Sequence, residues 1–339
     1  RPPSCDRRRA VGSPATTGVG GIDMCTSIRF SDGSHLYLAR NLDWTSGYGE
    51  RVVVTPTGYA TRSPFGAVPG IRHAVIGMGI VEDDTPLYFD CGNDAGLAVA
   101  GLNFPGGYAV YADGPVDGGA TNVAAYELPL WVPRSSPRST RSRPRSSTSS
   151  WSTGRSTRST RARCCTGSSA TRRARSSWRA RARACRCSTT TSTSWRTSRA
   201  SPGTTRTCGT TSTPPPDFPG TSVLGRAHLS PFGSGSHMRG IPGDYYSTSR
   251  FVRAAYVNAH YPDKTSEEEN VSRAFHTLQQ VAMVDGCAAM DSGEFEKTIY
   301  TGLFSSRTTT YYWNTYDDPA VRSVAMADHR PDGTDLVVV

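Results

Sequence analysis

The feature that most constrains the fold is a run of 80 residues, 134–213, that cannot build a hydrophobic core. It holds 19 Arg, 21 Ser and 18 Thr, and it contains no Leu, Ile, Val, Met, Phe or Tyr. Burial of large apolar side chains is the main favourable term in folding, so this run cannot offset the entropy lost when a chain is ordered. The fold must therefore come from two flanks, residues 24–133 and 216–339, which enclose a low-complexity Arg/Ser/Thr segment at 134–215.

The same run reverses the charge of the protein. The formal net charge is +10, but the 19 Arg of the run stand without any acidic residue, so the rest of the chain carries −9. A strongly basic chain, taken as a whole, suggests a nucleic acid or an anionic surface as partner. Because the flanks are acidic, we predict no nucleic-acid partner. An Arg-rich RNA-binding segment and a solvated linker are the alternative interpretations of the run.

We favour a third interpretation, translation in a shifted reading frame. Shifted by one base, codons for residues 163–169 can read Leu-Leu-His-Trp-Ile-Ile-Gly, and those for 176–178 can read Ile-Val-Val. Codons for 193–199 can likewise read Val-Leu-Ala-Asn-Glu-Pro. These strings resemble buried strands and a strand-end turn, which the flanks lead one to expect here. The sequence therefore predicts a frameshift, with residues about 134–215 not native-like.

Cysteine usage and apolar patterning favour a reduced, cytoplasmic setting. The cysteines outside the run are too few and too scattered for a disulfide scaffold. No apolar stretch approaches the ~20 residues that a membrane helix needs, so we expect no membrane partner. The His residues show no zinc-ligand spacing, and we expect neither a metal nor a cofactor. The cysteines outside the run are Cys5, Cys25, Cys91 and Cys287.

The N-terminal flank has the pattern of short antiparallel strands. Residues 27–38 are expected to form a hairpin that turns at Asp32-Gly33, because this dipeptide lies between two β-type runs. The end of the flank, from Asn122 to Val132, is expected to form an amphipathic helix. Further strands are expected at 51–55, 73–81, 86–91 and 97–102.

The C-terminal flank has the pattern of two helices followed by strands. Ser247-Thr248-Ser249 is expected to cap a helix from 250 to about 259. Ser266 and Glu269 form a capping-box pattern at the start of a second helix. Strands are expected at 308–315 and 321–326. Strands, then helices, then strands predict an α+β fold in which sheets are sandwiched between helices.

The residues with chemical potential begin at Met24-Cys25. Residues 1–23 are expected to be a disordered N-terminal extension, with Met24 as the natural initiator. If Cys25 becomes the first residue, its α-amine, with a pKa of about 7.7–8.0, can accept the proton of its thiol. Arg40 can hold the thiolate and Asp43 the α-ammonium, which predicts hydrolysis of an amide whose leaving amine needs a proton. A buried structural cysteine and an ordinary ion pair are the alternative interpretations.

Seven short motifs occur along the chain in a characteristic order, and the first two include Cys25, Arg40 and Asp43. Together they make the chain similar to the choloylglycine hydrolase family, and most of all to its conjugated bile acid (bile salt) hydrolases. The motifs are Met-Cys-Thr at 24–26, Arg-Asn-Leu-Asp-Trp at 40–44, Tyr-Phe-Asp-Cys at 88–91, Gly-Leu-Asn-Phe-Pro-Gly at 101–106, Gly-Ile-Pro-Gly-Asp at 240–244, Ser-Arg-Phe-Val-Arg at 249–253 and Tyr-Tyr-Trp-Asn-Thr-Tyr-Asp-Asp-Pro at 311–319.

The resemblance implies a four-layer αββα sandwich of the N-terminal-nucleophile hydrolases, usually a homotetramer, that acts on a small-molecule amide such as a conjugated bile acid. Cys25 would be the nucleophile, Arg40 its neighbour and Asp43 the partner of the α-amine. Asn103 would contribute to the oxyanion hole, where one donor is worth roughly 3 to 4 kcal/mol, and Arg250 would complete the polar site. The residues implied for the apolar substrate pocket are Leu42, Trp44, Val81 and Phe104.

The chain also departs from the family in ways that predict an inactive product. The family carries a second oxyanion Asn, whose place falls near Arg196-Thr197 in the shifted segment, where no Asn stands. Residues 1–23 and Met24 would acylate the α-amine of Cys25 unless they are removed. The alternatives to bile acid hydrolysis are a penicillin V or other N-acyl amide acylase and a non-functional frameshifted product. The family's penicillin branch usually has Tyr at the position of Asn103, which favours bile salts here.

Overall fold

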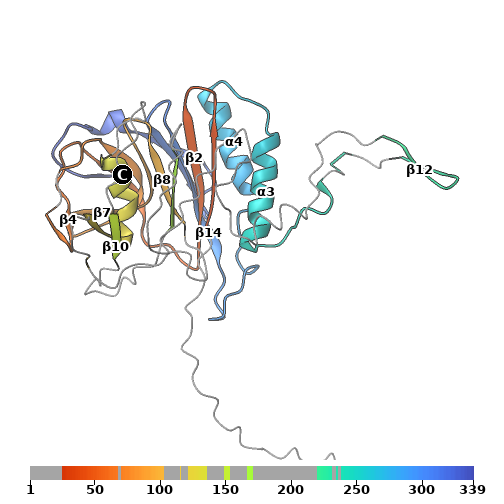
Figure 1. Cartoon of the computed structure of the whole chain (residues 1–339), viewed down its shortest axis with the longest axis horizontal. Coiled ribbons are helices and arrows are strands. Elements are labelled where there is room, and N and C mark those ends of the chain that lie inside the picture. Colours follow the sequence, from red (N-terminus) through yellow and green to blue (C-terminus); the bar gives the residue numbers. More distant parts are fainter. Residues whose placement is uncertain are drawn as a thin grey trace, which may run out of the picture.

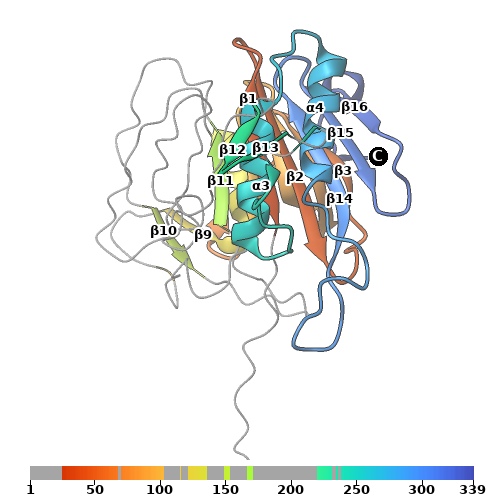
Figure 2. The same ribbon diagram turned by 90° about the vertical axis from the view of Figure 1, so that its right-hand side faces the viewer.

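The structure is a computed structural model that describes residues 25–67, 70–102, 115, 121–135, 149–152, 166–170, 220–230, 234–235 and 238–339. Two β-sheets lie face to face at its centre, and helices cover their outer faces (Figures 1 and 2). The expected α+β, four-layer αββα arrangement is therefore confirmed. Of the segment 134–215, only 134–135, 149–152 and 166–170 lie within the described residues.

The first sheet has five antiparallel strands in the order β1-β2-β14-β15-β16. Its centre, β14, comes from the C-terminal flank and pairs with β2 from the N-terminal flank. The N-terminal and C-terminal flanks are therefore joined into one sheet. Cys25, the nucleophile candidate, lies directly before the edge strand β1. The strands are β1 (Thr26–Ser31), β2 (Leu36–Trp44), β14 (Lys297–Ser305), β15 (Thr310–Thr315) and β16 (Arg322–Ala325).

The second sheet has six strands in the order β11-β8-β7-β6-β3-β17. β8 is buried along its whole length, and β11 from the Arg/Ser/Thr segment pairs with it at the edge of the sheet. The strands are β3 (Arg51–Thr55), β6 (Val75–Glu82), β7 (Thr85–Asn93), β8 (Ala98–Leu102), β11 (Thr166–Ala170) and β17 (Val337–Val338).

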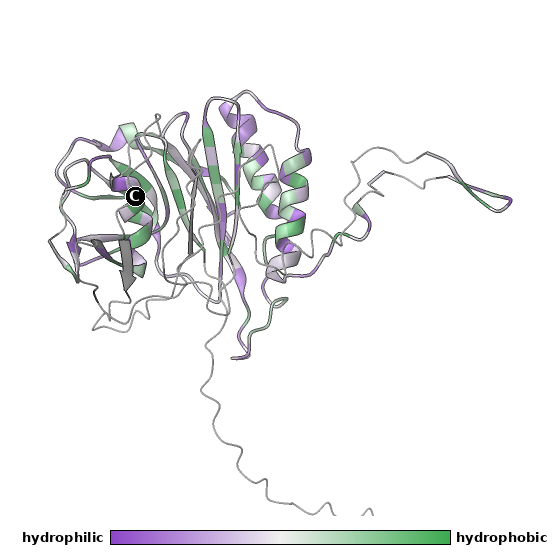
Figure 3. Cartoon of the chain, in the orientation of Figure 1, coloured by the Kyte–Doolittle hydropathy of each residue, from purple (hydrophilic) through white to green (hydrophobic). Residues whose placement is uncertain are grey.

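In the described part of the chain, three α-helices form the outer layers. α3 (Ser247–His260) and α4 (Glu267–Gln279) pack on the first sheet, and α1 (Leu128–Ser135) packs on β7 and β8 of the second. Buried apolar side chains cluster at each interface, and Figure 3 colours the hydrophobic residues of these strands and helices green. Leu38 and Ile76 lie between the sheets, Phe30 of β1 and Leu278 of α4 belong to the cluster between the first sheet and its helices, and Leu130 of α1 belongs to the cluster on the second sheet.

The remaining short elements pair locally. Two hairpins, β4-β5 and β12-β13, form two-stranded sheets of their own, and β9 pairs in parallel with β10. Among the described residues, no helix is both long and apolar enough to cross a membrane. The elements are β4 (Arg62–Ser63), β5 (Gly66–Ala67), β9 (Thr121–Ala124), η1 (Ala125–Glu127), β10 (Ser149–Ser152), β12 (Ser222–Leu224), β13 (Ala227–Leu229) and η3 (Met326–His329).

Local expectations were met where the signal was a turn or a capping box. The predicted hairpin turns at Asp32-Gly33, where Gly33 has a φ of +96° that favours glycine. The capping box of α4 is formed, since Ser266 and Glu269 each accept a hydrogen bond from the other's backbone N–H. This reciprocal arrangement satisfies two of the donors left free at a helix start.

Two expectations about helix starts were wrong. The helix expected from Asn122 begins only at Leu128, because 121–124 is extended and paired with β10. α3 begins at Ser247 after Tyr246, which makes no side-chain cap. Asp244 takes the place of the expected serine cap, since its carboxylate accepts hydrogen bonds from the Tyr246 N–H and the Ser249 hydroxyl, both at 2.9 Å.

Candidate active site

The site is built around β2, whose alternation sends its charged side chains to opposite faces. Leu38 and Leu42 belong to the cluster between the sheets, and Arg40 lies between them on that face. Asp43 projects from the other face, where it meets Arg250 of α3. Arg40 is 2% exposed and Asp43 is 1% exposed. Two charges placed in the interior of one strand must be compensated there, and the rest of the site does so.

Cys25 stands immediately before β1, beside the next strand of the same sheet. Its Sγ accepts a hydrogen bond from Nη2 of Arg40 at 2.8 Å. The residue is half-buried and packs against the inter-sheet cluster. Burial raises the pKa of the Cys25 thiol, and Arg40 and Arg250 oppose that rise while Asp43 adds to it. The thiol therefore needs a base to become a nucleophile near neutral pH.

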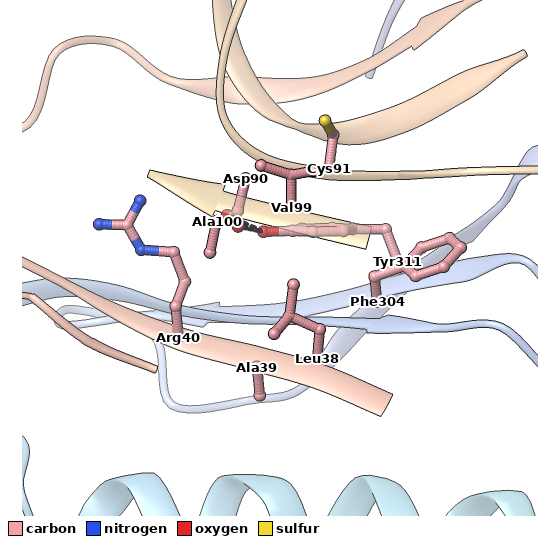
Figure 4. A pocket seen from close by; sticks show the side chains of 9 residues that line it. All are labelled: Leu38, Ala39, Arg40, Asp90, Cys91, Val99, Ala100, Phe304 and Tyr311. Carbon is pink, nitrogen blue, oxygen red and sulfur yellow. Dashed lines mark hydrogen bonds between the residues drawn. The ribbon is translucent and has the colours of Figure 1, made fainter. Parts of the chain in front are cut away.

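Arg40 is held from the far side by the second sheet. Its Nη1 donates to the carbonyl oxygen of Phe89 at 3.2 Å. The adjacent Asp90 is buried and accepts hydrogen bonds from Tyr311 at 2.6 Å and from Tyr300 at 2.9 Å. Burial raises the pKa of Asp90, and Arg40 and the two hydroxyls oppose this. Asp90 thus places its carboxyl group in the space behind Arg40, and Figure 4 draws both side chains.

The space in which Arg40 and Asp90 lie is a packed interior. The cavity drawn in Figure 4 leaves no room for a water molecule. The side chain of Arg40 is therefore fixed by packing between the sheets, and its Nη2 faces the Sγ of Cys25. The lining residues are Leu38, Ala39, Arg40, Asp90, Cys91, Val99, Ala100, Phe304 and Tyr311.

Asp43 is held by two donors on its two oxygens. Nη1 of Arg250 lies 2.6 Å from Oδ2, and the Thr298 hydroxyl donates to Oδ1 at 2.6 Å. The same Arg250 nitrogen donates to the Thr26 hydroxyl at 2.8 Å, and its Nε donates to the Tyr245 carbonyl at 3.0 Å. Burial raises the pKa of Asp43, and Arg250, Thr298 and Arg40 all oppose the rise. The fully buried Arg250 and Asp43 form an ion pair, and Arg250 links it to Thr26, the residue that follows the nucleophile candidate.

The structure brings four of the predicted site residues together and leaves the others apart or unplaced. Cys25, Arg40, Asp43 and Arg250 form one connected group. Asn103 and Phe104 lie outside the described residues. Leu42 is buried between the sheets, and Trp44 is half-buried at the end of β2.

Val81 lies elsewhere, in a different part of the molecule from Leu42. It packs with the cluster under α1 and lines a surface cleft of about 290 Å³ together with Tyr48, Arg51 and Glu82. Across the described part of the chain, no group of three or more His, Cys, Asp or Glu side chains could hold a metal ion.

Sequence reasoning missed the groups that support these four residues. Asp90 lies in the Tyr-Phe-Asp-Cys motif, but nothing in that motif showed that its carboxylate would face Arg40. Thr298 and Tyr300 lie on β14, for which we expected no strand. The signal was present, since 297–305 is rich in β-branched and aromatic residues.

The four-layer αββα sandwich is the architecture of the N-terminal-nucleophile hydrolases, and Cys25 stands beside its edge strand as the nucleophile candidate. The sequence pattern of the linear amide C-N hydrolases of the choloylglycine hydrolase family matches residues 25–138 and 215–339. The chain therefore belongs to the choloylglycine hydrolase family, whose members are linear amide hydrolases. The match begins at Cys25 and leaves out residues 139–214, which fall within the Arg/Ser/Thr segment.

Two relatives align over almost their whole length. The chain is 42% identical to the bile salt hydrolase/transferase of Bifidobacterium longum, covering 93% of this chain and 99% of the relative. It is 34% identical to the conjugated bile acid hydrolase of Lactobacillus acidophilus, with the same two coverages.

Two solved structures share the fold. A mutant conjugated bile acid hydrolase from Clostridium perfringens superposes with a TM-score of 0.74 at 20% identity, over 93% of this chain and 96% of that one. A penicillin V acylase from Agrobacterium tumefaciens gives a TM-score of 0.57 at 13% identity, over 93% and 89%.

Proposed function

We propose that this protein hydrolyses the amide bond of glycine- or taurine-conjugated bile acids, with Cys25 as an N-terminal nucleophile. The observation that carries the proposal is the contact of Cys25 Sγ with Arg40, next to the buried Asp43–Arg250 pair. The two relatives at 42% and 34% identity, both named for bile salt or bile acid hydrolysis, support this substrate class. Asn103 supports it further, through the resemblance described above.

The reaction needs Cys25 to be the first residue. Its α-amine takes the thiol proton, and the thiolate, held by Arg40, attacks the carbonyl carbon of the amide. Asp43 holds the resulting α-ammonium. As the tetrahedral intermediate collapses, the C–N bond breaks and the α-ammonium gives its proton to the leaving glycine or taurine. Water then adds to the thioester with the α-amine as base, which releases the bile acid and restores the thiol.

The charge that develops on the carbonyl oxygen needs donors. Asn103 is proposed as one donor, and a second Asn is expected in the native frame of the Arg/Ser/Thr segment. Arg250 supports the same region through its pair with Asp43, and its Nη2 has no hydrogen-bond partner among the described residues. Each preorganised donor is worth roughly 3 to 4 kcal/mol of barrier, so losing the second Asn alone lowers the rate by two to three orders of magnitude.

We also propose that 134–215 is a segment read in a shifted frame. The alignment with the Bifidobacterium longum relative runs over 322 residues and 93% of this chain, so it spans the segment that the family pattern leaves out. The segment thus occupies the place of a stretch of similar length in the relative, and we do not interpret it as an insertion. β11 supports this as well, because Thr166–Ala170 pairs with β8, which is buried along its whole length. The shifted reading at this place, Trp-Ile-Ile-Gly, has the aromatic and β-branched residues that favour strands, and the printed residues have only Thr166 of these types.

The test compares the printed chain with a frame-restored chain that begins at Cys25. The nucleotide sequence around codons 133 and 216 should show one inserted or missing base compensated by a second change. The frame-restored chain should hydrolyse glycocholate and taurocholate faster than penicillin V, and the printed chain should hydrolyse none of them. Cys25→Ala in the frame-restored chain should abolish turnover, and activity retained in this variant would remove Cys25 from the mechanism. Faster turnover of penicillin V would favour the acylase alternative.

A further inference from the structure

Thr298 lies directly opposite Asp43 in the antiparallel pairing of β14 with β2. The register of this pairing shifts between Thr298 and Tyr300, which marks a β-bulge beside the site. Residues two apart in a regular strand share a face, but here Tyr300 reaches Asp90 between the sheets while Thr298 reaches Asp43 on the helix side. Bulges of this kind re-aim side chains and are frequent next to active sites.

The contacts of Thr298 fix the direction of its hydroxyl proton. The Met283 N–H, just after α4, donates to Thr298 Oγ1 at 2.8 Å. The backbone N–H of Thr298 in turn donates to the Met283 carbonyl at 3.0 Å. Because Met283 supplies a donor, the single hydroxyl proton is left to Asp43 Oδ1, 2.6 Å away. Thr298 is 5% exposed, so water does not compete for this hydrogen bond.

We propose that Thr298 is a positioning residue that keeps Asp43 ionised and aimed at the α-amine of Cys25. The inference rests on the proposed function, because Asp43 holds that amine only if Cys25 is the first residue. With Arg250 on Oδ2 and Thr298 on Oδ1, the carboxylate can neither rotate nor accept a proton on Oδ1 without losing a donor. Thr298 itself touches no reacting atom.

The electrostatic setting makes this role measurable. The charged groups that act on Asp43 are Arg250 from α3 and Arg40 from its own strand, and the Cys25 thiol lies ahead of β1. From β14 the group in contact is the neutral hydroxyl of Thr298. Burial raises the pKa of Asp43, and the hydrogen bond from Thr298 opposes that rise. Removing the hydroxyl should therefore raise the pKa of Asp43 further.

The chain offers a matched control on the same strand. Thr301 is buried, lies opposite Asn41 in the same pairing and donates to Asn41 Oδ1 at 2.8 Å. Thr301→Val removes an equivalent buried hydrogen bond whose acceptor does not titrate. Thr298→Val and Thr301→Val thus differ in the one property that matters, the charge of the acceptor. Thr298→Ser keeps the hydroxyl and should behave as the parent does.

The first measurement is urea unfolding between pH 4 and pH 8, made in the printed chain and in the frame-restored chain. A folded-state pKa raised by burial gives stability that is full below the unfolded pKa and is lost as pH rises through the folded pKa. Thr298→Val raises the folded pKa again, so its deficit relative to the parent should grow with pH. A shift of about one pKa unit corresponds to a tenfold change, or about 1.4 kcal/mol, between the two ends of the range. The deficit of Thr301→Val should stay constant.

The second measurement is the pH profile of bile salt hydrolysis by the frame-restored chain. Thr298→Val should lower kcat/KM about tenfold on the acid side and leave KM within twofold, whereas Thr298→Ser and Thr301→Val should keep the parent profile. The stability deficit of Thr298→Val is assessed in whichever of the two chains unfolds in a single transition. If this deficit does not change with pH, the proposal is overturned. If the parent shows no hydrolysis but the pH-dependent deficit appears, the proposed function fails while the action of Thr298 on Asp43 stands.

Discussion

The ion pair between Asp43 and Arg250 gives the sharpest stability prediction. Its side chains are 0% and 1% exposed, and Nη1 of Arg250 lies 2.6 Å from Oδ2 of Asp43. Asp43→Asn removes one charge and leaves the other buried. Breaking a buried pair in this way typically costs 3–5 kcal/mol, because the remaining charge has neither water nor a counter-ion. Arg250 would keep only neutral acceptors, the Thr26 hydroxyl and the Tyr245 carbonyl, and its Nη2 has no acceptor among the described residues.

The expected loss is therefore about 4 kcal/mol for Asp43→Asn, a large part of the 5–15 kcal/mol that stabilises a typical domain. The assay is urea unfolding at pH 7 of the frame-restored chain, with the slope of the transition checked for two-state behaviour. Adding Arg250→Met should recover about 2 kcal/mol or more, because the double variant no longer leaves the guanidinium of Arg250 as an uncompensated buried charge. Asp318→Asn, which breaks the exposed pair with Arg322, is the control and should leave the midpoint unchanged.

Two results would refute this reasoning. One is a cost below about 1 kcal/mol for Asp43→Asn, which would place the pair in effective contact with water. The other is strict additivity of Asp43→Asn and Arg250→Met, which would mean that the two side chains do not interact energetically.

Two further predictions concern the support of Arg40 and the assembly of the protein. Asp90→Asn should lower the pKa of the Cys25 thiol, because the charge of Arg40 is then no longer shared with a carboxylate. The check is the pH dependence of Cys25 alkylation followed by mass spectrometry, with exposed Cys287 as internal reference and Tyr311→Phe as a charge-neutral control; an unchanged or raised pKa would refute it. The expected homotetramer should need the β12-β13 hairpin, which stands away from the sheets in Figure 1 and exposes Val223 (61%) and Leu224 (72%). Light scattering should show smaller particles for the double variant Val223→Ser, Leu224→Ser, and an unchanged mass would exclude the hairpin from assembly.

The layers of the fold were predictable because they follow from local patterns and from motif order. Hairpins, capping boxes and the succession of strands and helices are encoded within a few residues, as at Asp32-Gly33 and at Ser266. The start of α3 was not predictable in this way. Its first turn is held by the carboxylate of Asp244, which accepts hydrogen bonds from the Tyr246 N–H and from the Ser249 hydroxyl that was expected to act as the cap. The helix expected from Asn122 failed for a similar reason, since β9 pairs with a distant strand.

The site was predictable as a set of residues but not as an arrangement. Arg40 and Asp43 share one motif, yet the three-residue spacing in a strand sends them to opposite faces, one between the sheets and one under the helices. The groups that hold them come from far along the chain: Asp90 from β7, and Thr298 from a strand that lies 255 residues from Asp43 in sequence. The contact of Thr298 with Asp43 depends on the register of β2 with β14, and local propensity carries no information about register.

The neighbours of Cys25 lead to a final prediction about its α-amine. The groups that act on the thiol in the described part of the chain are Arg40, Asp43 and Arg250, and neither guanidinium can accept a proton. Both oxygens of Asp43 already accept hydrogen bonds, from Arg250 and Thr298. The proposed base is therefore the α-amine, and a frame-restored chain with one glycine added before Cys25 should lose at least about a hundredfold in kcat, the usual contribution of a positioned base.

The Cys25–Arg40 contact does not involve the α-amine, so the added glycine should leave the alkylation rate of Cys25 within about threefold of the parent. The activity of the parent should rise with pH through the α-amine pKa, about 7.7–8.0 before the pull of Asp43, which favours the charged amine and raises that value. Full activity in the glycine-extended chain would show that another group takes the thiol proton. Equal loss of activity and of thiol reactivity would mean that the extension displaces Cys25 from Arg40, and the assignment of the α-amine as base would then lose its support.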